Sequence, residues 1–191
     1  VAIVGARRAT QAGLAIARNF AQTLARAGFI VTSGMADGID GAAHAAVLDA
    51  GEPTIAVVGT GPDRVYPRKH HALARRIVEQ GALVSDFPPG TSARPHHFPR
   101  RNRIIAGLAL GTLVIEAGLQ SGSLITARQA GEQGREVFAV PGSIHNPQAQ
   151  GCHRLIRDGA RLVETPEEVA EVLAPLAREL GCELARRLDG P

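Results

Sequence analysis

Aromatic side chains are scarce in this sequence of 191 residues, where they make up 3% of the composition, with no tryptophan and one tyrosine. Proteins that hold nucleic acid by stacking successive bases need a platform of aromatic rings. A site of that kind is therefore excluded. If the protein binds a nucleic acid, contacts to the sugar-phosphate backbone of that nucleic acid must provide most of the binding.

Cysteines and long apolar runs are also scarce. Cys152 and Cys182 form no CxxC pattern and have no metal-ligand spacing, which is typical of a protein of the reducing cytoplasm. The histidine pairs at 70–71 and 96–97 lack ligand spacing on a shared face, so we expect no metal ion and no cofactor. No segment approaches the roughly 20 apolar residues that a membrane span needs, and no signal-peptide pattern opens the chain. We expect a cytoplasmic protein without membrane contact.

Charge is distributed unevenly along the chain. The formal net charge is +3, but residues 164–191 hold seven acids against three arginines, a net −4 that leaves +7 on residues 1–163. A basic body with an acidic tail predicts a polyanionic partner for the body. We expect residues 1–173 to form one domain and the acidic, polar residues 174–191 to link it to a domain absent here. The sequence starts on an expected strand without methionine, which suggests a fragment of a longer protein.

Short apolar runs alternate with segments of helical periodicity along residues 1–173. The expected strands are 1–5, 29–33, 53–58, 82–85, 112–115, 136–140 and, at an edge, 161–163. The expected helices are 10–27, 39–50, 67–80, 104–110, 123–133, a short one near 155–156, and 166–173. This alternation predicts an α/β fold with a doubly wound, mostly parallel sheet and helices on both faces, as in Rossmann-like domains. Ligands of such sheets bind beyond the carboxyl ends of the strands.

A basic run at 98–103 precedes the expected helix at 104–110. Arg100, Arg101 and Arg103 lie within four residues, and no acid occurs between Thr91 and Arg103 to neutralise them. Unpaired backbone N–H groups and the helix dipole favour an anion at the start of a helix. The run therefore predicts a phosphate site, whereas a solvated basic helix start is the plain alternative.

Three further loops follow expected strands. Arg7 follows the first strand, where only the first glycine of a GxGxxG motif is present and where a guanidinium suits a phosphate. The turn from Gly34 to Gly38 predicts an anion cradle, with strand-to-helix packing as the alternative. The loop at 116–126 brings hydroxyls and N–H groups to another helix start.

Acidic residues beside these loops have a structural and a catalytic interpretation. Glu116 follows a central strand, and we favour a role as a structural anchor for the glycine loops over that of a catalytic acid. Asp40 and His44 lie one helical turn apart, and a structural hydrogen bond between them is favoured over catalysis.

Assembled in order, these segments closely resemble the core domain of the DNA-processing protein A (DprA/Smf) family. The matching stretches cover nearly all of residues 1–163: VAIVGAR at 1–7, SGMADGIDGAAH at 33–44, Tyr-Pro at 66–67, FPRRNRIIA at 98–106, EAGLQSGSLIT at 116–126, GREVFAVPG at 134–142 and GCHRLIRDGA at 151–160. The resemblance implies a non-enzymatic recombination mediator that binds single-stranded DNA and protects incoming DNA during natural transformation. It also implies loading of the RecA recombinase, and a homodimer.

The resemblance also implies which residues make these contacts. The expected DNA-binding residues are Arg7, Ser33, Gly34, Gly38, Phe98, Arg100, Arg101, Arg103, Ser121, Gly122 and Thr126. The expected dimer and RecA surface holds His153, Leu155, Ile156 and Arg161.

A second hypothesis comes from another class. The glycine turn and the loop after Glu116 are similar to those of LOG-type phosphoribohydrolases, which cleave the base from a nucleoside monophosphate. Glu116 and Arg103 would then stabilise the ribosyl cation and the phosphate. Against it, the PGGxGTxxE run of those enzymes is absent. A nucleotide-sensing module without turnover is the third possibility.

Overall fold

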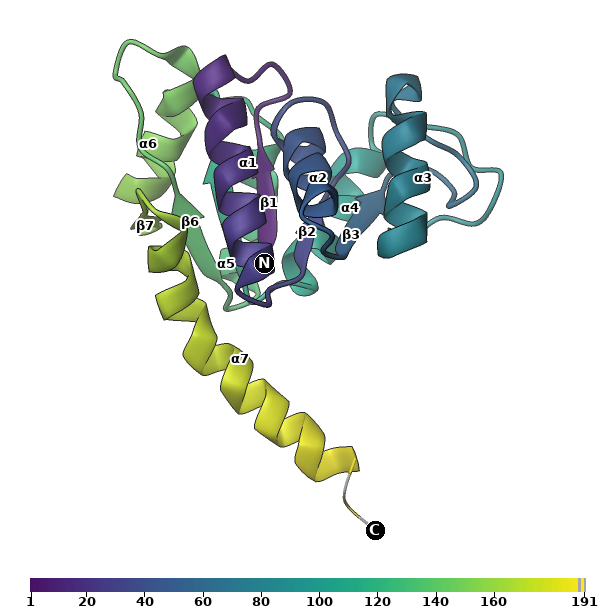
Figure 1. The fold of residues 1–191 in the computed structure, drawn as a ribbon. Helices are drawn as coiled ribbons and strands as arrows, with labels where there is room; N and C mark the ends of the chain where they lie inside the picture. The colour runs from purple at the N-terminus through teal and green to yellow at the C-terminus, as the bar shows by residue number, and fades with distance from the viewer. Residues whose placement is uncertain (189, 191) are drawn as a thin grey trace.

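The computed structural model describes residues 1–188 and 190, and within them seven strands form one sheet (Figure 1). All neighbouring strands pair in parallel, in the order β4-β3-β2-β1-β5-β6-β7. The strands are β1 (Ala2–Gly5), β2 (Val31–Ser33), β3 (Thr54–Val58), β4 (Ala82–Ser85), β5 (Gly111–Ile115), β6 (Glu136–Ala139) and β7 (Arg161–Leu162). The predicted doubly wound α/β fold is confirmed, and the sheet is entirely rather than mostly parallel.

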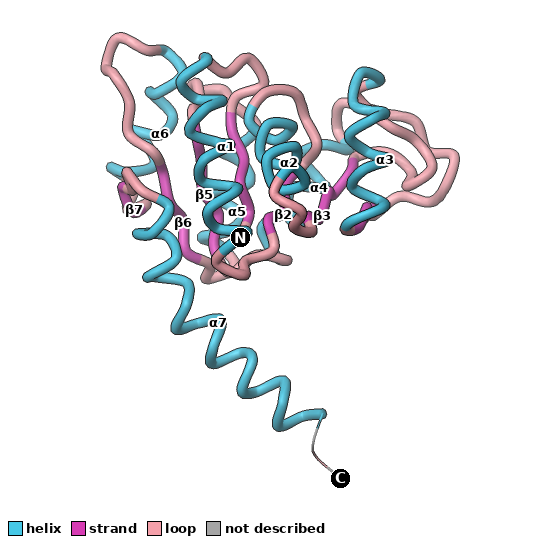
Figure 2. Tube along the Cα trace, viewed as in Figure 1, coloured by secondary structure: helices cyan, strands magenta, loops and turns pink. Residues whose placement is uncertain are grey.

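Helices connect the strands and cover both faces of the sheet (Figure 2). They are α1 (Gln11–Arg26), α2 (Ile39–Asp49), α3 (His71–Gln80), α4 (His97–Gly107), α5 (Ser123–Glu132), α6 (Gln150–Arg157) and α7 (Pro166–Leu188), with 3-10 turns η1 (Arg68–His70) and η2 (Pro147–Ala149). None of the helices in the described part of the chain is long and apolar enough to cross a membrane.

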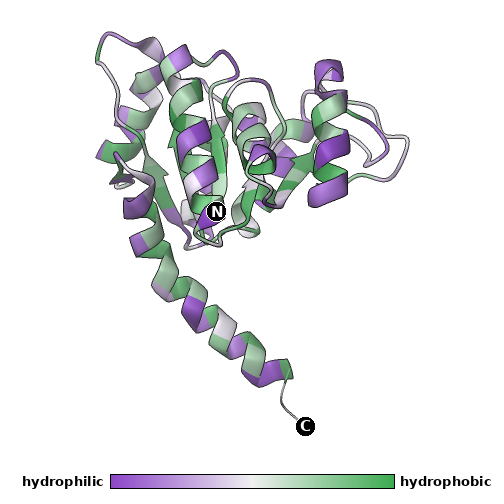
Figure 3. Cartoon of the chain, in the orientation of Figure 1, coloured by the Kyte–Doolittle hydropathy of each residue, from purple (hydrophilic) through white to green (hydrophobic). Residues whose placement is uncertain are grey.

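The side chains of the strands pack alternately into two apolar layers, because successive side chains of a strand point to opposite faces of the sheet. Ile3, Leu113 and Phe138 pack beneath α1, α2 and the start of α7. Their neighbours Val4 and Val114 pack beneath α4, α5 and α6 on the other face. Figure 3 shows apolar residues on the strands and on the inner sides of the helices. The helices are therefore held by burial on both sides of the sheet.

Helix α4 begins earlier than its sequence suggests. The expected helix covers 104–110, but α4 starts at His97 and ends at Gly107, so the basic run lies inside it. Pro99 is the third helical residue, where a backbone N–H has no intrahelical partner in any case. The proline therefore does not break the helix. The arginines consequently point to different sides of α4.

Helix α7 ends later than expected. Its start is fixed by Glu168, whose carboxylate accepts hydrogen bonds from the N–H groups of Glu164 (2.6 Å) and Thr165 (3.0 Å), which lower its pKa. The sequence predicts an end at Leu173, but the helix continues past Pro175 to Leu188 because the following residues are mostly strong helix formers. The role of residues 174–191 as a linker stays a prediction.

Close contact between β1 and β5 depends on Gly5. A Cβ atom added there would overlap the carbonyl oxygen of Ile115 and lie 2.6 Å from Cγ1 of Ile39. We expect Gly5→Ala to lower the free energy of unfolding by about 2 kcal/mol or more, because these neighbours are backbone and core. Gly131→Ala is the matched control: it meets open space on α5 and should stabilise by up to about 1 kcal/mol. Urea unfolding would measure both, and equal effects would contradict this account of Gly5.

Candidate functional site

A cleft of about 920 Å³ opens beyond the carboxyl ends of β1 and β5. Here the chain order reverses, because β2 lies on one side of β1 and β5 lies on the other. Such a switch point is where open α/β sheets bind ligands. The cleft is lined by the residues after β1, the inner side of α4, the loop between β5 and α5, and residues near the start of α6. The structure therefore places a binding site where the strand order predicts one.

One wall of the cleft carries a small aromatic pair next to an exposed arginine. The ring centroids of Tyr66 and Phe98 lie 5.4 Å apart. The guanidinium carbon of Arg7 lies 5.6 Å from the Phe98 centroid. Arg7 is exposed and Phe98 is half-buried, so both present accessible atoms to the cleft. This wall suits one stacked ring and one anionic group rather than a row of bases.

The opposite element of the site is the start of α5. Ser121, Gly122, Ser123 and Thr126 line the cleft, with the Ser121 and Ser123 hydroxyl oxygens 2.7 Å apart. The amide of Asn102 on α4 donates a hydrogen bond to the Gly122 carbonyl (3.3 Å) and ties the loop to α4. Hydroxyls and the positive end of a helix dipole favour an anion here. The predicted residues of this loop are therefore brought together with Arg7 and Phe98 in one cleft.

Arg101 also lines the cleft, but its side chain is buried, with 3% exposure. Its Nη1 donates hydrogen bonds to the carbonyls of Gly34 (2.8 Å) and Val57. Burial lowers its pKa to about 10, against the opposing effect of the Asp40 carboxylate, so the guanidinium stays charged at neutral pH. Arg101 thus joins the ends of β2 and β3 to α4, besides forming part of the cleft floor.

Backbone N–H groups in and directly after the turn from Gly34 to Gly38 donate hydrogen bonds to other groups of the protein. The N–H groups of Gly34 and Ala36 donate to Oδ2 of Asp40 at 3.1 and 3.3 Å, and the N–H of Ile39 donates to the Ala6 carbonyl at 3.2 Å. Gly38 has φ 76°, and an added Cβ would overlap the Ala6 carbonyl. These contacts favour packing, the plain alternative to the predicted anion cradle. Ala36 and Asp40 line the cleft, whereas Gly34 and Gly38 do not.

Two other predicted contacts near this turn differ from expectation. The Ser33 hydroxyl is fully buried and donates to the Ile3 carbonyl at 2.6 Å. The expected hydrogen bond between Asp40 and His44 is wrong: Nδ1 of His44 lies 2.8 Å from the Thr54 hydroxyl. Burial lowers the pKa of His44 to about 3, so its ring is neutral. These residues hold the core beneath the cleft.

Glu116 anchors neighbouring segments rather than facing the cleft. Its carboxylate accepts hydrogen bonds from the N–H (2.8 Å) and hydroxyl (2.5 Å) of Thr10 and from the amide of Asn146 (3.2 Å). Glu116 itself has φ 51°. The favoured anchoring role agrees with this geometry, although the segments held are the start of α1 and the loop before α6.

Arg100 and Arg103 lie on the outer side of α4, away from the residues that line the cleft. Nε of Arg100 and Nη2 of Arg103 lie 3.1 and 2.8 Å from the same oxygen, Oδ2 of Asp86. The hydrogen bond from Arg103 contributes most to lowering the pKa of Asp86. The expectation that no acid neutralises the basic run is wrong, because Asp86 precedes the acid-free stretch that begins at Thr91.

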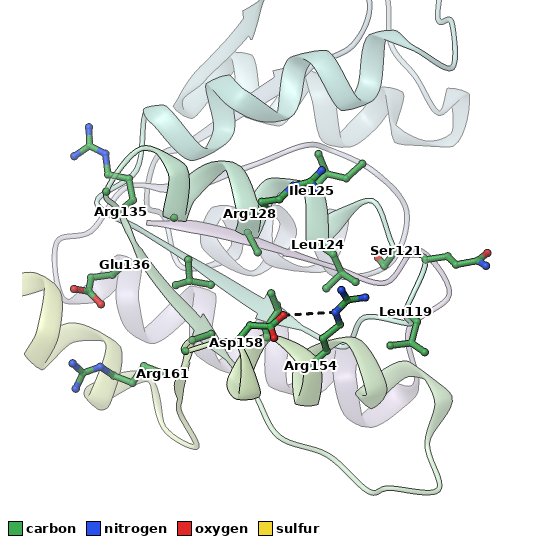
Figure 4. A pocket seen from close by; sticks show the side chains of 18 residues that line it. Leu119, Ser121, Leu124, Ile125, Arg128, Arg135, Glu136, Arg154, Asp158 and Arg161 are labelled. Carbon is green, nitrogen blue, oxygen red and sulfur yellow. Dashed lines mark ion pairs between the residues drawn. The ribbon is translucent and has the colours of Figure 1, made fainter.

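A second groove, of about 730 Å³, lies between α5 and α6 (Figure 4). Leu155 and Arg161 from the predicted dimer and RecA surface line it, and Arg154 forms an ion pair with Asp158 at 3.6 Å. Leu155 and Ile156 both pack against the apolar layer, but Ile156 does not line the groove. The ring of His153 lies 2.9 Å from the Gly142 carbonyl oxygen. The predicted surface is thus split between an open groove and packed positions.

Several polar residues of the cleft were not expected from the sequence. Asn102 lies four residues after Phe98, so both lie on the inner side of α4. This spacing would have identified Asn102 if the helix had been expected to begin at His97. Arg8 and Gln120 adjoin the predicted Arg7 and Ser121, whereas Gln148 and Gln150 come from a segment distant in sequence. In the described part of the chain, no cluster of three or more histidine, cysteine or acidic residues is placed to hold a metal ion.

The fold and cleft define a Rossmann-like α/β protein with an anion-friendly site at its switch point. More narrowly, the chain belongs to the DNA recombination-mediator protein A family, whose model matches residues 1–174. It is 53% identical to Protein Smf of Escherichia coli over 174 residues, which are 91% of this chain and 46% of that relative. The family resemblance found in the sequence is confirmed.

Solved structures of two proteins named DNA processing protein A have the same fold as this chain. DNA processing protein A from Streptococcus pneumoniae superimposes with a TM-score of 0.84 at 44% identity, over 89% of this chain and 60% of that one. The Helicobacter pylori protein, described for its single-stranded DNA binding mode, gives 0.83 at 26% identity, over 91% of this chain and 79% of that one. The chain spans about half the length of the E. coli relative.

Removing the Arg101 side chain should destabilise the fold. We expect Arg101→Met to cost about 3 to 5 kcal/mol in urea unfolding, because Asp40 would remain buried without its neighbouring cation. Burial raises the pKa of Asp40 in the folded protein, so its ionisation opposes folding as pH rises. The deficit of Arg101→Met should therefore grow from mildly acidic to neutral pH.

Two variants control this measurement. Adding Asp40→Asn to Arg101→Met should recover part of the loss, since the uncompensated charge is gone. Arg100→Met, at a side chain that is 61% exposed, should change stability by no more than about 0.5 kcal/mol. A deficit that is independent of both pH and Asp40 would contradict this role for Arg101.

Proposed function

We propose that this chain binds single-stranded DNA in the cleft beyond the carboxyl ends of β1 and β5. The observation that carries the proposal is the joining of Arg7, the Phe98 and Tyr66 rings and the start of α5 in one cleft. Membership of the family and the single-stranded DNA binding described for the H. pylori protein support it. The cleft provides phosphate contacts at two points and a ring for one base.

The binding is expected to be largely independent of base sequence. Guanidinium, hydroxyl and helix N-terminal contacts address phosphates, and they carry no information about bases. The Phe98 ring adds stacking, which every base accepts. Affinity should therefore depend steeply on salt and weakly on sequence.

The site supports binding rather than turnover, and we propose a non-enzymatic role. Glu116, the acid of the hydrolase hypothesis, is held by Thr10 and Asn146 away from the cleft. Asp40 holds the turn after β2, and burial raises its pKa. The acids near the cleft thus serve the fold. A hydrolase or nucleotide sensor remains the alternative that binding experiments address.

The outer arginines extend the proposed DNA path. Arg100 and Arg103 are 61% and 51% exposed at their side chains, and Asp86 offsets part of their charge. We place a further phosphate of the strand beside them. In this arrangement the strand runs from the cleft around α4, whereas Arg101, Ser33, Gly34 and Gly38 support the cleft from beneath.

The roles of the whole protein follow as proposals. We infer that it protects incoming single-stranded DNA in natural transformation, loads RecA onto that DNA, and acts as a homodimer. The groove between α5 and α6, with Leu155 and Arg161 on its wall, is the surface that we assign to these protein partners.

Loss of one phosphate contact should be visible in the salt dependence. We expect Arg7→Ala to weaken binding of a fluorescent oligo-dT, and to make the slope of log affinity against log salt shallower by about 0.7. Arg26→Ala is the matched control, because it removes an exposed arginine from the far end of α1 with the same change in net charge. Titration of a matching duplex tests strand preference.

The same titration tests the alternatives. Unchanged affinity in Arg7→Ala would contradict the assignment of the cleft. If the folded wild-type chain bound no oligonucleotide but bound or cleaved nucleoside monophosphates, the sensor or the hydrolase would replace the DNA-binding proposal.

Removing Asp86's charge should free the outer arginines. We expect Asp86→Asn to tighten oligo-dT binding several-fold and to steepen its salt dependence, because Arg100 and Arg103 then carry two uncompensated charges. Asp49→Asn is the control: it removes an exposed acid paired with Arg76 at 2.7 Å, with the same charge change. If both variants gained affinity equally, net charge alone would explain the effect and no phosphate would lie beside α4.

A further inference from the structure

Two guanidinium groups of the cleft lie close to the same aromatic ring. The Cζ atoms of Arg7 and Arg101 lie 5.6 and 5.9 Å from the centroid of the Phe98 ring. Arg7 is exposed at the wall, whereas Arg101 is buried at the floor. Burial is the largest cause of the lowered pKa of Arg101, and the like charge of Arg7 lowers it further. An anion bound between the two guanidinium groups would relieve their repulsion.

Arg101 has hydrogen-bond donors that the fold does not use. Its hydrogen bonds to the carbonyls of Gly34 and Val57 both come from Nη1. Among the described residues, neither the buried Nε nor Nη2 has a hydrogen-bond partner. Nε and Nη2 form the edge of a guanidinium that binds two oxygens of a phosphate side by side. A buried donor without an acceptor costs free energy, so this edge points to a ligand that brings acceptor oxygens into the cleft.

The start of α5 brings further donors to the same cleft. The hydroxyl oxygens of Ser121 and Ser123 lie 2.7 Å apart, and both residues line the cleft. A Cβ atom added to Gly122, between them, would meet nothing within 4 Å, so a ligand oxygen can approach the backbone there. The positive end of the helix dipole favours an anion at this place. Donors thus converge on the cleft from the loop after β1, from α4 and from the start of α5.

The net charge of the cleft lining matches a dianion. Three arginines line the cleft, Arg7, Arg8 and Arg101, and Asp40 is the only acid among the described residues that does so, which leaves a net charge of +2. A phosphate inside a DNA strand is a diester with one negative charge and two free oxygens. A phosphate monoester carries a charge of about −1.5 to −2 at pH 7 and has three acceptor oxygens. The charge and the three converging elements therefore fit a monoester better than a diester.

We propose that the cleft binds a phosphorylated end of a DNA strand, with the terminal phosphate monoester between Arg7, Arg101 and the start of α5. This inference rests on the proposed function and narrows it from single-stranded DNA in general to a strand end. The single ring pair of Tyr66 and Phe98 suits the base of one terminal nucleotide. The rest of the strand then leaves the cleft toward the outer arginines of α4.

Oligonucleotides that differ only at their ends test the proposal on the 191-residue chain. An oligo-dT with an internal fluorophore is titrated with a 5′-phosphate, with a 3′-phosphate, with hydroxyls at both ends, and as a closed circle of the same length. We expect one phosphorylated end to bind about tenfold more tightly than the hydroxyl-ended and circular strands, which corresponds to one charge-assisted hydrogen bond. Blocking that phosphate as a methyl ester is the matched control and should abolish the preference. Equal affinity of all these strands would overturn end recognition and leave single-stranded DNA binding in place.

Two variants test where the terminal phosphate lies. Arg101→Lys keeps a charge beside Asp40 but has no planar fork, so it should lower the affinity ratio of phosphorylated to circular strand several-fold. Ser123→Ala removes one hydroxyl of the cleft and should lower the same ratio, and it decides the question if urea unfolding shows that Arg101→Lys is not folded. Ser143→Ala is the matched control, because it removes an exposed hydroxyl that does not line the cleft. An unchanged ratio in Ser123→Ala and in folded Arg101→Lys would overturn this placement.

A free nucleotide carries the same phosphate monoester, so dTMP and thymidine distinguish the two sources of this group. We expect dTMP to displace the phosphorylated oligonucleotide more effectively than thymidine does, and equal competition by both would contradict the monoester contact. Binding of dTMP without binding of any oligonucleotide would overturn both the strand-end assignment and the proposed function. Tight binding of the circular strand without any preference for an end would overturn the strand-end assignment alone.

Discussion

One buried guanidinium sets the shape of the cleft. Arg101 donates to the carbonyls of Gly34 and Val57, and thereby holds the ends of β2 and β3 against α4. Asp40 secures the same turn from the other side by accepting two backbone N–H groups. Removing the partners of a buried charge costs free energy, because the charge is then left without compensation in the protein interior. Arg101 therefore keeps these segments in fixed positions relative to one another. This contact fixes the rotation of α4, which turns Phe98 toward the cleft.

The rotation of α4 places its arginines on two different sides of the helix. Arg101 faces inward and supports the floor, whereas Arg100 and Arg103 face outward and share Asp86. The accessible charge inside the cleft comes from Arg7 and from the start of α5. Because the few aromatic residues provide a single ring pair here, phosphate contacts must supply most of the affinity for a nucleic acid strand. The acids serve as anchors, which agrees with a site built for binding.

The family core and α7 serve separate ends of the molecule. The core holds the cleft at the carboxyl ends of the strands, and the family match ends at residue 174. Helix α7 uses one continuous apolar face, first to pack against α1 and then to extend from the body. The outer part of α7 therefore lies apart from the cleft.

The sequence by itself determined the strand and helix succession, the parallel sheet and the family. These depend on local periodicity and on motifs whose residues are neighbours in the chain. It also located the loops at the switch point, including Arg7 and Ser121. Tertiary structure alone decided that α4 starts before the arginines, that Asp86 pairs with two of them, and that the Gly34 turn packs against Asp40. The physical reason is that burial, ion pairing and the rotation of a helix are set by side chains distant in sequence, which no local pattern records.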